Sequence, residues 1–101
     1  MNVLKIDTSK MGIVKVALYQ GKEGLVKEKE QKFGSQVLLN MIEEILKKGD
    51  IKMKDLDGIE VNTGPGSFTG LRVGVSVANA LGFSLGIPVN GKEIETEIEY
   101  S

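Results

Sequence analysis

The chain has 101 residues, a formal charge of −1 at neutral pH, and neither Cys nor His. A chain of this length buries roughly two thirds of its unfolded surface, which supports one hydrophobic core but not two domains. The missing residue types exclude disulfides, thiolate chemistry and a Ser-His-Asp triad, and they remove the commonest ligands of transition metals.

The small net charge also excludes attraction to nucleic acid by bulk charge, so contact with RNA would need a local basic patch or a partner protein. No apolar run reaches the length of a membrane span, and we therefore expect no membrane partner. The N-terminus leads directly into a strand pattern and lacks the layout of a signal peptide, which predicts a cytoplasmic protein.

The first third of the chain has the pattern of a three-stranded antiparallel meander. Val3 to Asp7 is a short buried strand, and polar turn formers follow it. Gly12 to Gln20 is apolar on most of both faces, which indicates an interior strand. Leu25 to Lys32 alternates charged residues, as suits an exposed edge strand.

An amphipathic helix is predicted next, with Ser35 as its cap and Gly49 at its end. Its apolar residues recur every three or four positions, which is the spacing of one helix face. We expect this face to serve the core, and its excess width leaves room for a partner helix as well. The residues of this helix predicted to meet a partner are Leu38, Met41, Ile42 and Ile45.

The second half predicts a strand at Gly58 to Asn62, a glycine-rich turn, and a helix from about Thr69 to Ser84. This helix is apolar nearly all round, so it must be covered on most sides. Its small residues allow another backbone to approach closely. The residues of this helix predicted to meet a partner are Leu71, Arg72, Gly74, Val75 and Ala78.

A last short parallel strand is predicted at Ile87 to Asn90. Right-handed crossovers then predict an α/β fold with a mixed five-stranded sheet in the order 3-2-1-4-5, which is the ribonuclease-H-like arrangement, and two main helices. The tail from Glu93 to Ser101 alternates again and predicts an extra strand with one acidic face. We expect residues 1–91 to form the lobe and residues 92–101 an acidic tail.

The glycine-rich turn is the most specific motif in the chain, and it invites a phosphate-binding interpretation. Neither a Walker A loop nor a dinucleotide fingerprint fits, because Thr69 occupies the second-glycine or third-glycine position of these patterns and no Lys follows. We expect a shaped turn that caps a buried helix, with a phosphate cradle as the alternative. The candidate residues are Gly64, Pro65, Gly66, Ser67, Thr69 and Gly70.

Asp7, Thr8 and Ser9 follow the first strand and resemble the first phosphate loop of the actin-like ATPases. In that superfamily an acidic residue and a hydroxyl at this turn hold metal and phosphate. An ordinary Asx-type turn explains the same residues and is the preferred interpretation. No second wall that would close over a nucleotide is found in this sequence.

Taken together, these motifs carry a resemblance to a known family. The run from Leu4 to Ser9 and the run GPGSFTGLRVG from Gly64 to Gly74 strongly resemble the TsaB, or YeaZ, family, and Ile87 to Val89 continues the likeness. The resemblance covers about residues 1 to 91, which corresponds to the N-terminal lobe of that family. Family members are about twice as long as this chain.

The resemblance implies a ribonuclease-H-like, actin-ATPase-related lobe that is not an enzyme. It implies pairing with a TsaD-like protein, which a TsaE-like protein joins, in the assembly that attaches a threonylcarbamoyl group to the adenosine next to the anticodon of tRNA. The two helices would supply the interface and could also form a homodimer. No metal or cofactor is implied, ATP or ADP would bind only in the complex, and contact with tRNA would be indirect.

Two other hypotheses remain from the residues themselves. The first is a self-dimerising binding module that uses the same helices and has no role with tRNA. The second is a phosphate-binding fragment that uses Asp7 and the glycine-rich turn.

Overall fold

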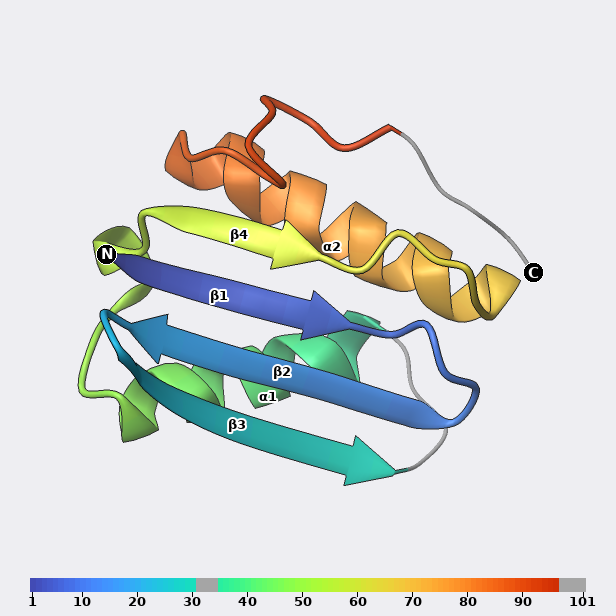
Figure 1. Cartoon of the computed structure of the whole chain (residues 1–101), viewed down its shortest axis with the longest axis horizontal. Helices are drawn as coiled ribbons and strands as arrows, with labels where there is room; N and C mark the ends of the chain where they lie inside the picture. The colour runs from blue at the N-terminus through green and yellow to red at the C-terminus, as the bar shows by residue number, and fades with distance from the viewer. Residues whose placement is uncertain (31–34, 97–101) are drawn as a thin grey trace.

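The structure, a computed structural model, describes residues 1–30 and 35–96. Four strands form one mixed sheet in the order β3-β2-β1-β4 (Figure 1). The strands are β1 Asn2–Asp7, β2 Ile13–Gln20, β3 Glu23–Glu30 and β4 Gly58–Val61. β1 pairs antiparallel with β2 and parallel with β4, and β2 pairs antiparallel with β3.

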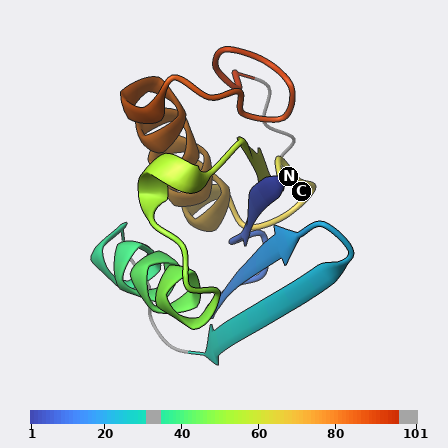
Figure 2. The same cartoon turned by 90° about the vertical axis from the view of Figure 1, so that its left-hand side faces the viewer.

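Two helices, α1 Ser35–Lys48 and α2 Phe68–Leu85, cover one face of the sheet. Figure 2 shows both helices on the same side, with α1 beside β2 and β3 and α2 beside β1 and β4. A short 3₁₀ helix, η1 Met53–Asp55, lies in the connection between α1 and β4. The opposite face of the sheet is covered by no helix within the described residues.

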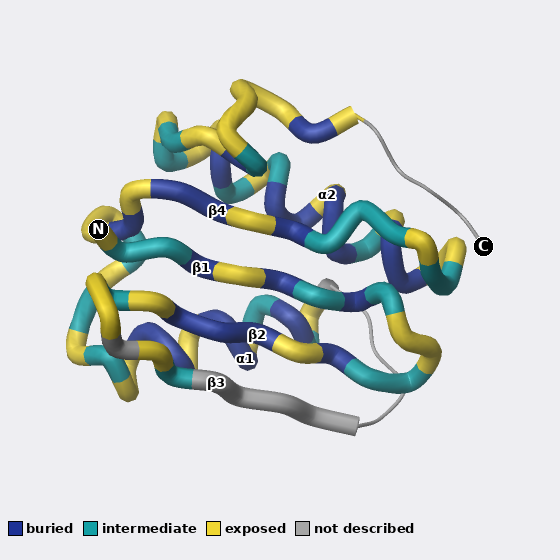
Figure 3. Tube along the Cα trace, in the orientation of Figure 1, coloured by how far each residue is buried: buried dark blue, intermediate teal, exposed yellow. Residues whose placement is uncertain are grey.

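The core lies between the sheet and the two helices. Along β2, Val14, Val16 and Leu18 are fully buried, whereas on the other face Lys15 and Tyr19 are exposed and only the small Ala17 between them is buried. This period of two is what a strand with one covered face requires. Figure 3 shows the same alternation of buried and exposed residues along β1 and β4.

The predicted fifth strand is wrong, because residues 87–90 contribute only one bridge to the sheet, between Val89 and Ile59. The backbone turns back immediately afterwards, since Asn90 and Gly91 both adopt positive φ angles of 52° and 76°. Consecutive positive φ values at Asn-Gly are typical of a two-residue hairpin. Residues 93–96 form no strand either, and the rest of the predicted tail strand lies outside the described residues.

The small residues of α2 allow this helix to lie close to its own sheet. A side chain at Gly74 would overlap the hydroxyl of Thr8, and one at Gly82 would overlap Val89. Close approach at these small residues is therefore made within the same chain, to the end of β1 at Gly74 and to the segment after α2 at Gly82. Ser67 caps the start of α2, and Gly86 ends it with φ 68°.

α2 corrects our expectation that no apolar segment reaches the length of a membrane span. The helix has 18 residues and a mean hydropathy of 1.2, so it could cross a membrane by length and composition alone. The core helix of a soluble protein meets the same criterion, and the inner side of α2 packs on the sheet with Leu71, Val75 and Ala78 buried.

Candidate functional site

The two predicted motif turns meet at one end of the sheet. The amide of Ser67 donates to the carbonyl of Ser9 over 2.7 Å, and the Thr8 hydroxyl donates to the carbonyl of Gly70. A side chain at Gly66 would overlap the backbone of Ser9, so this contact requires glycine. The structure thus brings the turn after β1 and the glycine-rich turn before α2 into direct contact.

Most amides of the glycine-rich turn already have partners within the chain. Gly64 N donates to Asn62 Oδ1 at 2.9 Å, Gly70 N donates to Ser67 Oγ at 3.4 Å, and Leu71 N donates to Ser67 O at 2.9 Å. A phosphate cradle needs such amides free to donate to the anion. The arrangement therefore favours a shaped, helix-capping turn over a phosphate site. Pro65 and Thr69 are exposed, and the Gly64–Pro65 peptide bond is cis.

Asp7 forms the polar centre of this end of the sheet. Its Oδ1 accepts hydrogen bonds from Ser9 N at 3.0 Å and from Ser9 Oγ at 2.6 Å, and Asn62 Nδ2 donates to the same Ser9 hydroxyl at 3.2 Å. Burial raises the pKa of the Asp7 carboxyl. The Ser9 hydrogen bonds, the Asn62 amide and the charge of Lys15 outweigh that effect, so the pKa lies below its ordinary value.

An open hollow lies beside Asp7 on the uncovered face of the sheet. Charges of both signs line it, namely the ammonium groups of Lys5 and Lys15 and the carboxylates of Asp7 and Glu60. The Lys5 ammonium lies 5.7 Å from the centroid of the Tyr19 ring. Because the lining has no dominant sign, it gives no preference for an anion or a cation. Among the described residues, no group of three His, Cys, Asp or Glu could hold a metal ion.

The predicted partner-binding residues lie mostly inside the chain. Arg72 is exposed, whereas the others are buried between the helices and the sheet: Leu38, Met41, Ile42, Ile45, Leu71, Gly74, Val75 and Ala78. A partner that docks on the intact lobe would therefore meet other residues of the same two helices.

The outer side of α2 carries a set of exposed residues, of which the sequence predicted only Arg72 as a partner contact. We call Phe68, Arg72, Ser76, Ala80 and Phe83 the docking face. Phe68 is 55% exposed, Phe83 is 87% exposed, and the Arg72 guanidinium lies 5.3 Å from the centroid of the Phe68 ring. These residues recur every three or four positions, which places them on one side of the helix. This pattern in the sequence can be recognised only when the buried residues of α2 are known.

The mixed sheet, the two helices on one face and the contact between the two turns define an α/β lobe of the TsaD-like, actin-like ATPase fold. The sequence matches the family described as TsaD, tRNA N6-adenosine threonylcarbamoyltransferase, over residues 10–91. The chain belongs to this family, and within it to the TsaB, or YeaZ, proteins, whose N-terminal lobe it resembles.

Individual relatives support this assignment. The TsaB protein of Haemophilus influenzae, named for tRNA threonylcarbamoyladenosine biosynthesis, is 35% identical over 88% of this chain and 38% of its own length. A tRNA N6-adenosine threonylcarbamoyltransferase of Geotalea uraniireducens is 33% identical over 93% of this chain and 28% of its own.

The similarity extends to solved structures. YeaZ from Pseudomonas aeruginosa superposes with a TM-score of 0.81 and 31% identity, over 87% of this chain and 41% of that one. The chain spans about two fifths or less of the relatives compared here.

Proposed function

We propose that the chain is a non-catalytic docking subunit that pairs with a TsaD-like protein through the docking face of α2. The exposure of Phe68 and Phe83 on this helix carries the proposal. Aromatic and Arg side chains are the residue types that contribute most to protein interfaces. The small residues Ser76 and Ala80 lie between the two aromatic residues, so a partner helix can approach the middle of α2 closely.

A positional role is consistent with the residues of the site. The 101 residues include neither His nor Cys, which are the side chains most often used as a general base or nucleophile near neutral pH. Docking would act by favouring the active conformation of the partner over its inactive one. In this proposal a TsaE-like protein joins the assembly in the cytoplasm, tRNA contacts the partner, and any ATP or ADP binds in the complex.

The test is light scattering after size-exclusion chromatography of the chain mixed with the TsaD-like protein of its own organism. We expect a one-to-one complex for the wild type and its loss for Phe68→Asp/Phe83→Asp. The matched control on α1 is Glu43→Asp/Lys47→Asp, which changes exposed residues and leaves the complex intact. A complex that survives the α2 substitutions would contradict docking through this face.

Self-association is a second candidate function, and the symmetry of the docking face favours it. Phe68 and Phe83 are separated by about 22 Å along the helix, with Ser76 near the midpoint. In an antiparallel, two-fold pair of α2 helices, Phe68 of one copy would therefore lie against Phe83 of the other. A homodimer that is lost in Phe68→Asp/Phe83→Asp, with no binding to the TsaD-like protein, would replace the first candidate by this one.

A further inference from the structure

Residues 87–96, which we call the strap, lie along the outer edge of β4 and then along α2, where Phe83 of the docking face lines the same hollow as strap residues 92–94. The first part of the strap bonds to β4 with its main chain. Ile59 N donates to Pro88 O at 3.0 Å, and Asn90 N donates to Ile59 O at 2.8 Å. These are the bonds that a fifth parallel strand would make, but the main chain makes them only at this single position.

The side chain of Asn90 replaces the main chain at the next position. Its Oδ1 accepts from Val61 N at 2.8 Å, and its Nδ2 donates to Val61 O at 3.0 Å. The primary amide thus pairs with one residue of β4 as a neighbouring strand would. Together with the bonds at Ile59, this pairing occupies the outward hydrogen-bonding groups of β4 at both positions.

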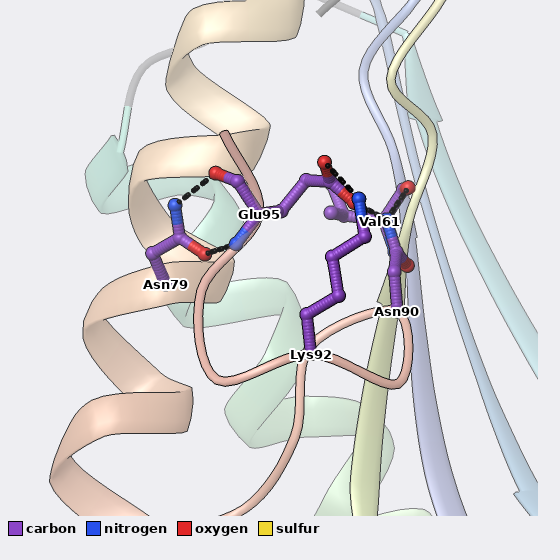
Figure 4. Close-up of polar contacts among 5 residues, drawn as sticks. All are labelled: Val61, Asn79, Asn90, Lys92 and Glu95. Atoms are coloured by element: carbon purple, nitrogen blue, oxygen red, sulfur yellow. Dashed lines mark hydrogen bonds and ion pairs between the residues drawn. The ribbon is translucent and has the colours of Figure 1, made fainter. Parts of the chain in front are cut away.

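A second asparagine holds the far end of the strap. Asn79, on α2, donates from Nδ2 to Glu95 O at 2.8 Å and accepts from Glu95 N at 2.7 Å. The Glu95 carboxylate is 4% exposed and joins the two ends, because its Oε2 accepts from Asn90 Nδ2 at 2.8 Å and its Oε1 accepts from Lys92 Nζ at 3.2 Å (Figure 4). A carboxylate buried to this extent is retained only with such donors.

We propose that the strap masks the outer edge of β4 and that the Asn90–Glu95 hydrogen bond is the lock that holds the strap in place. When the strap opens, this edge of β4 binds a strand of a second copy. An unmasked edge presents free N–H and C=O groups to other strands. The occupant that already fits is the strap of another copy, because exchange of an identical element restores the same hydrogen bonds between chains. This proposal does not depend on docking through α2.

The closed state is tested by amide hydrogen exchange, followed by NMR, in wild type and in Asn90→Gly. Glycine keeps the positive φ at this position and removes only the side chain. We expect exchange at the Val61 amide to become at least 10-fold faster, whereas the Leu4 amide in β1 is unchanged. Glu93→Ala is the control, because Glu93 is an exposed residue of the strap and takes no part in the hydrogen bonds that join Asn90, Val61, Asn79, Lys92 and Glu95. Unchanged exchange at Val61 would overturn the masking role.

A second variant keeps the test valid if Asn90→Gly does not fold. Glu95→Ala leaves both Asn90–Val61 bonds in place and removes the lock. We expect faster exchange at the amide of residue 95 and a smaller acceleration at Val61. If Glu95→Ala leaves both amides at their wild-type rates, the carboxylate is not a lock and that part of the proposal fails.

The strand-binding edge is tested by light scattering over a concentration series. The strap variants are measured in the Phe68→Asp/Phe83→Asp background, so that pairing through the docking face does not contribute. We expect Asn90→Gly to form dimers at high concentration, whereas Glu93→Ala in the same background stays monomeric. A monomeric Asn90→Gly protein whose Val61 amide exchanges rapidly would overturn the strand-binding edge and retain the mask.

Discussion

The two helices lie on the same face of one sheet, but they differ in the residues that they bury against the sheet and in those that they expose to solvent. α1 buries large aliphatic side chains such as Leu38 and Ile45, and the side chains that it exposes are all polar over residues 36–48, for which burial is described. The exposed residues of α1 are Gln36, Asn40, Glu43, Glu44, Lys47 and Lys48. α2 buries three glycines and mostly small aliphatic residues beside Leu71, and it exposes Phe68 and Phe83.

This difference separates a helix that only completes the core from a helix that is also available to a partner. Large side chains on α1 fill the space above β2 and β3, and its charged outer side favours water. Small side chains on the inner side of α2 bring that helix close to β1 and β4. Its aromatic residues then have no place in the core, and their exposure is unusual for residues of this size.

The largest effect on stability is expected from the buried face of α1. Ile45→Ala removes a fully buried side chain and leaves a cavity, which costs about 2–5 kcal/mol of unfolding free energy. Glu43→Ala, on the exposed face of the same helix, should change stability by no more than about 0.5 kcal/mol. Urea denaturation of both variants measures the contrast, and equal losses would refute the assignment of the two faces.

A somewhat smaller loss is expected from the inner face of α2. Gly74→Ala places a methyl group against the Thr8 hydroxyl and should cost about 1–3 kcal/mol by overpacking. In a Thr8→Ala background the hydroxyl is gone, so the same substitution should cost clearly less. Urea titration of the four proteins of this double-mutant cycle is the measurement, and additive losses would show that Thr8 is not the obstacle.

The outer faces of the two helices are compared by docking. Ser76→Lys places a long charged side chain in the middle of the docking face, and we expect at least 10-fold weaker binding to the TsaD-like partner, or about 1.4 kcal/mol. Asn40→Lys makes a similar change in charge on α1 and should leave binding unchanged. Calorimetric titration measures both, and equal weakening by both variants would remove the distinction between the helices.

The smallest effect is expected at the turns that join these helices to the sheet. The pKa of Asp7 is lowered from 3.8 in the folded protein, so its charge stabilises the fold above that pH, and the stabilisation is lost as the pH falls through the folded pKa. Asp7→Asn should therefore lower the unfolding free energy at neutral pH by less than about 1 kcal/mol. In urea titrations the difference from wild type should vanish in strong acid, and a difference independent of pH would contradict the role of the charge.

Much of the fold could be predicted because its signals are local. The period of two in β2 and the apolar spacing of α1 indicate these elements and their buried faces directly. The glycine-rich turn and the Asp7–Ser9 turn were both selected as motifs, and the structure brings them together. The fifth strand was mispredicted because an apolar run at residues 87–89 has the same pattern whether it pairs along its length or at one residue. The adjacent Asn90–Gly91 pair was the signal that the chain turns there.

The sequence by itself determined the class of fold, the capped start of α2 and the family, because these depend on residue types at fixed spacings along the chain. Only the tertiary structure decided which side of α2 is exposed to a partner and which segment covers the outer edge of β4. Gly74 on α2 packs directly against Thr8, which lies 66 residues earlier in the chain. The pairing of Asn90 with Val61 and of Asn79 with Glu95 likewise joins residues by their positions in space. Spacing along one helix or strand carries no information about such contacts, which the packing of separate elements creates.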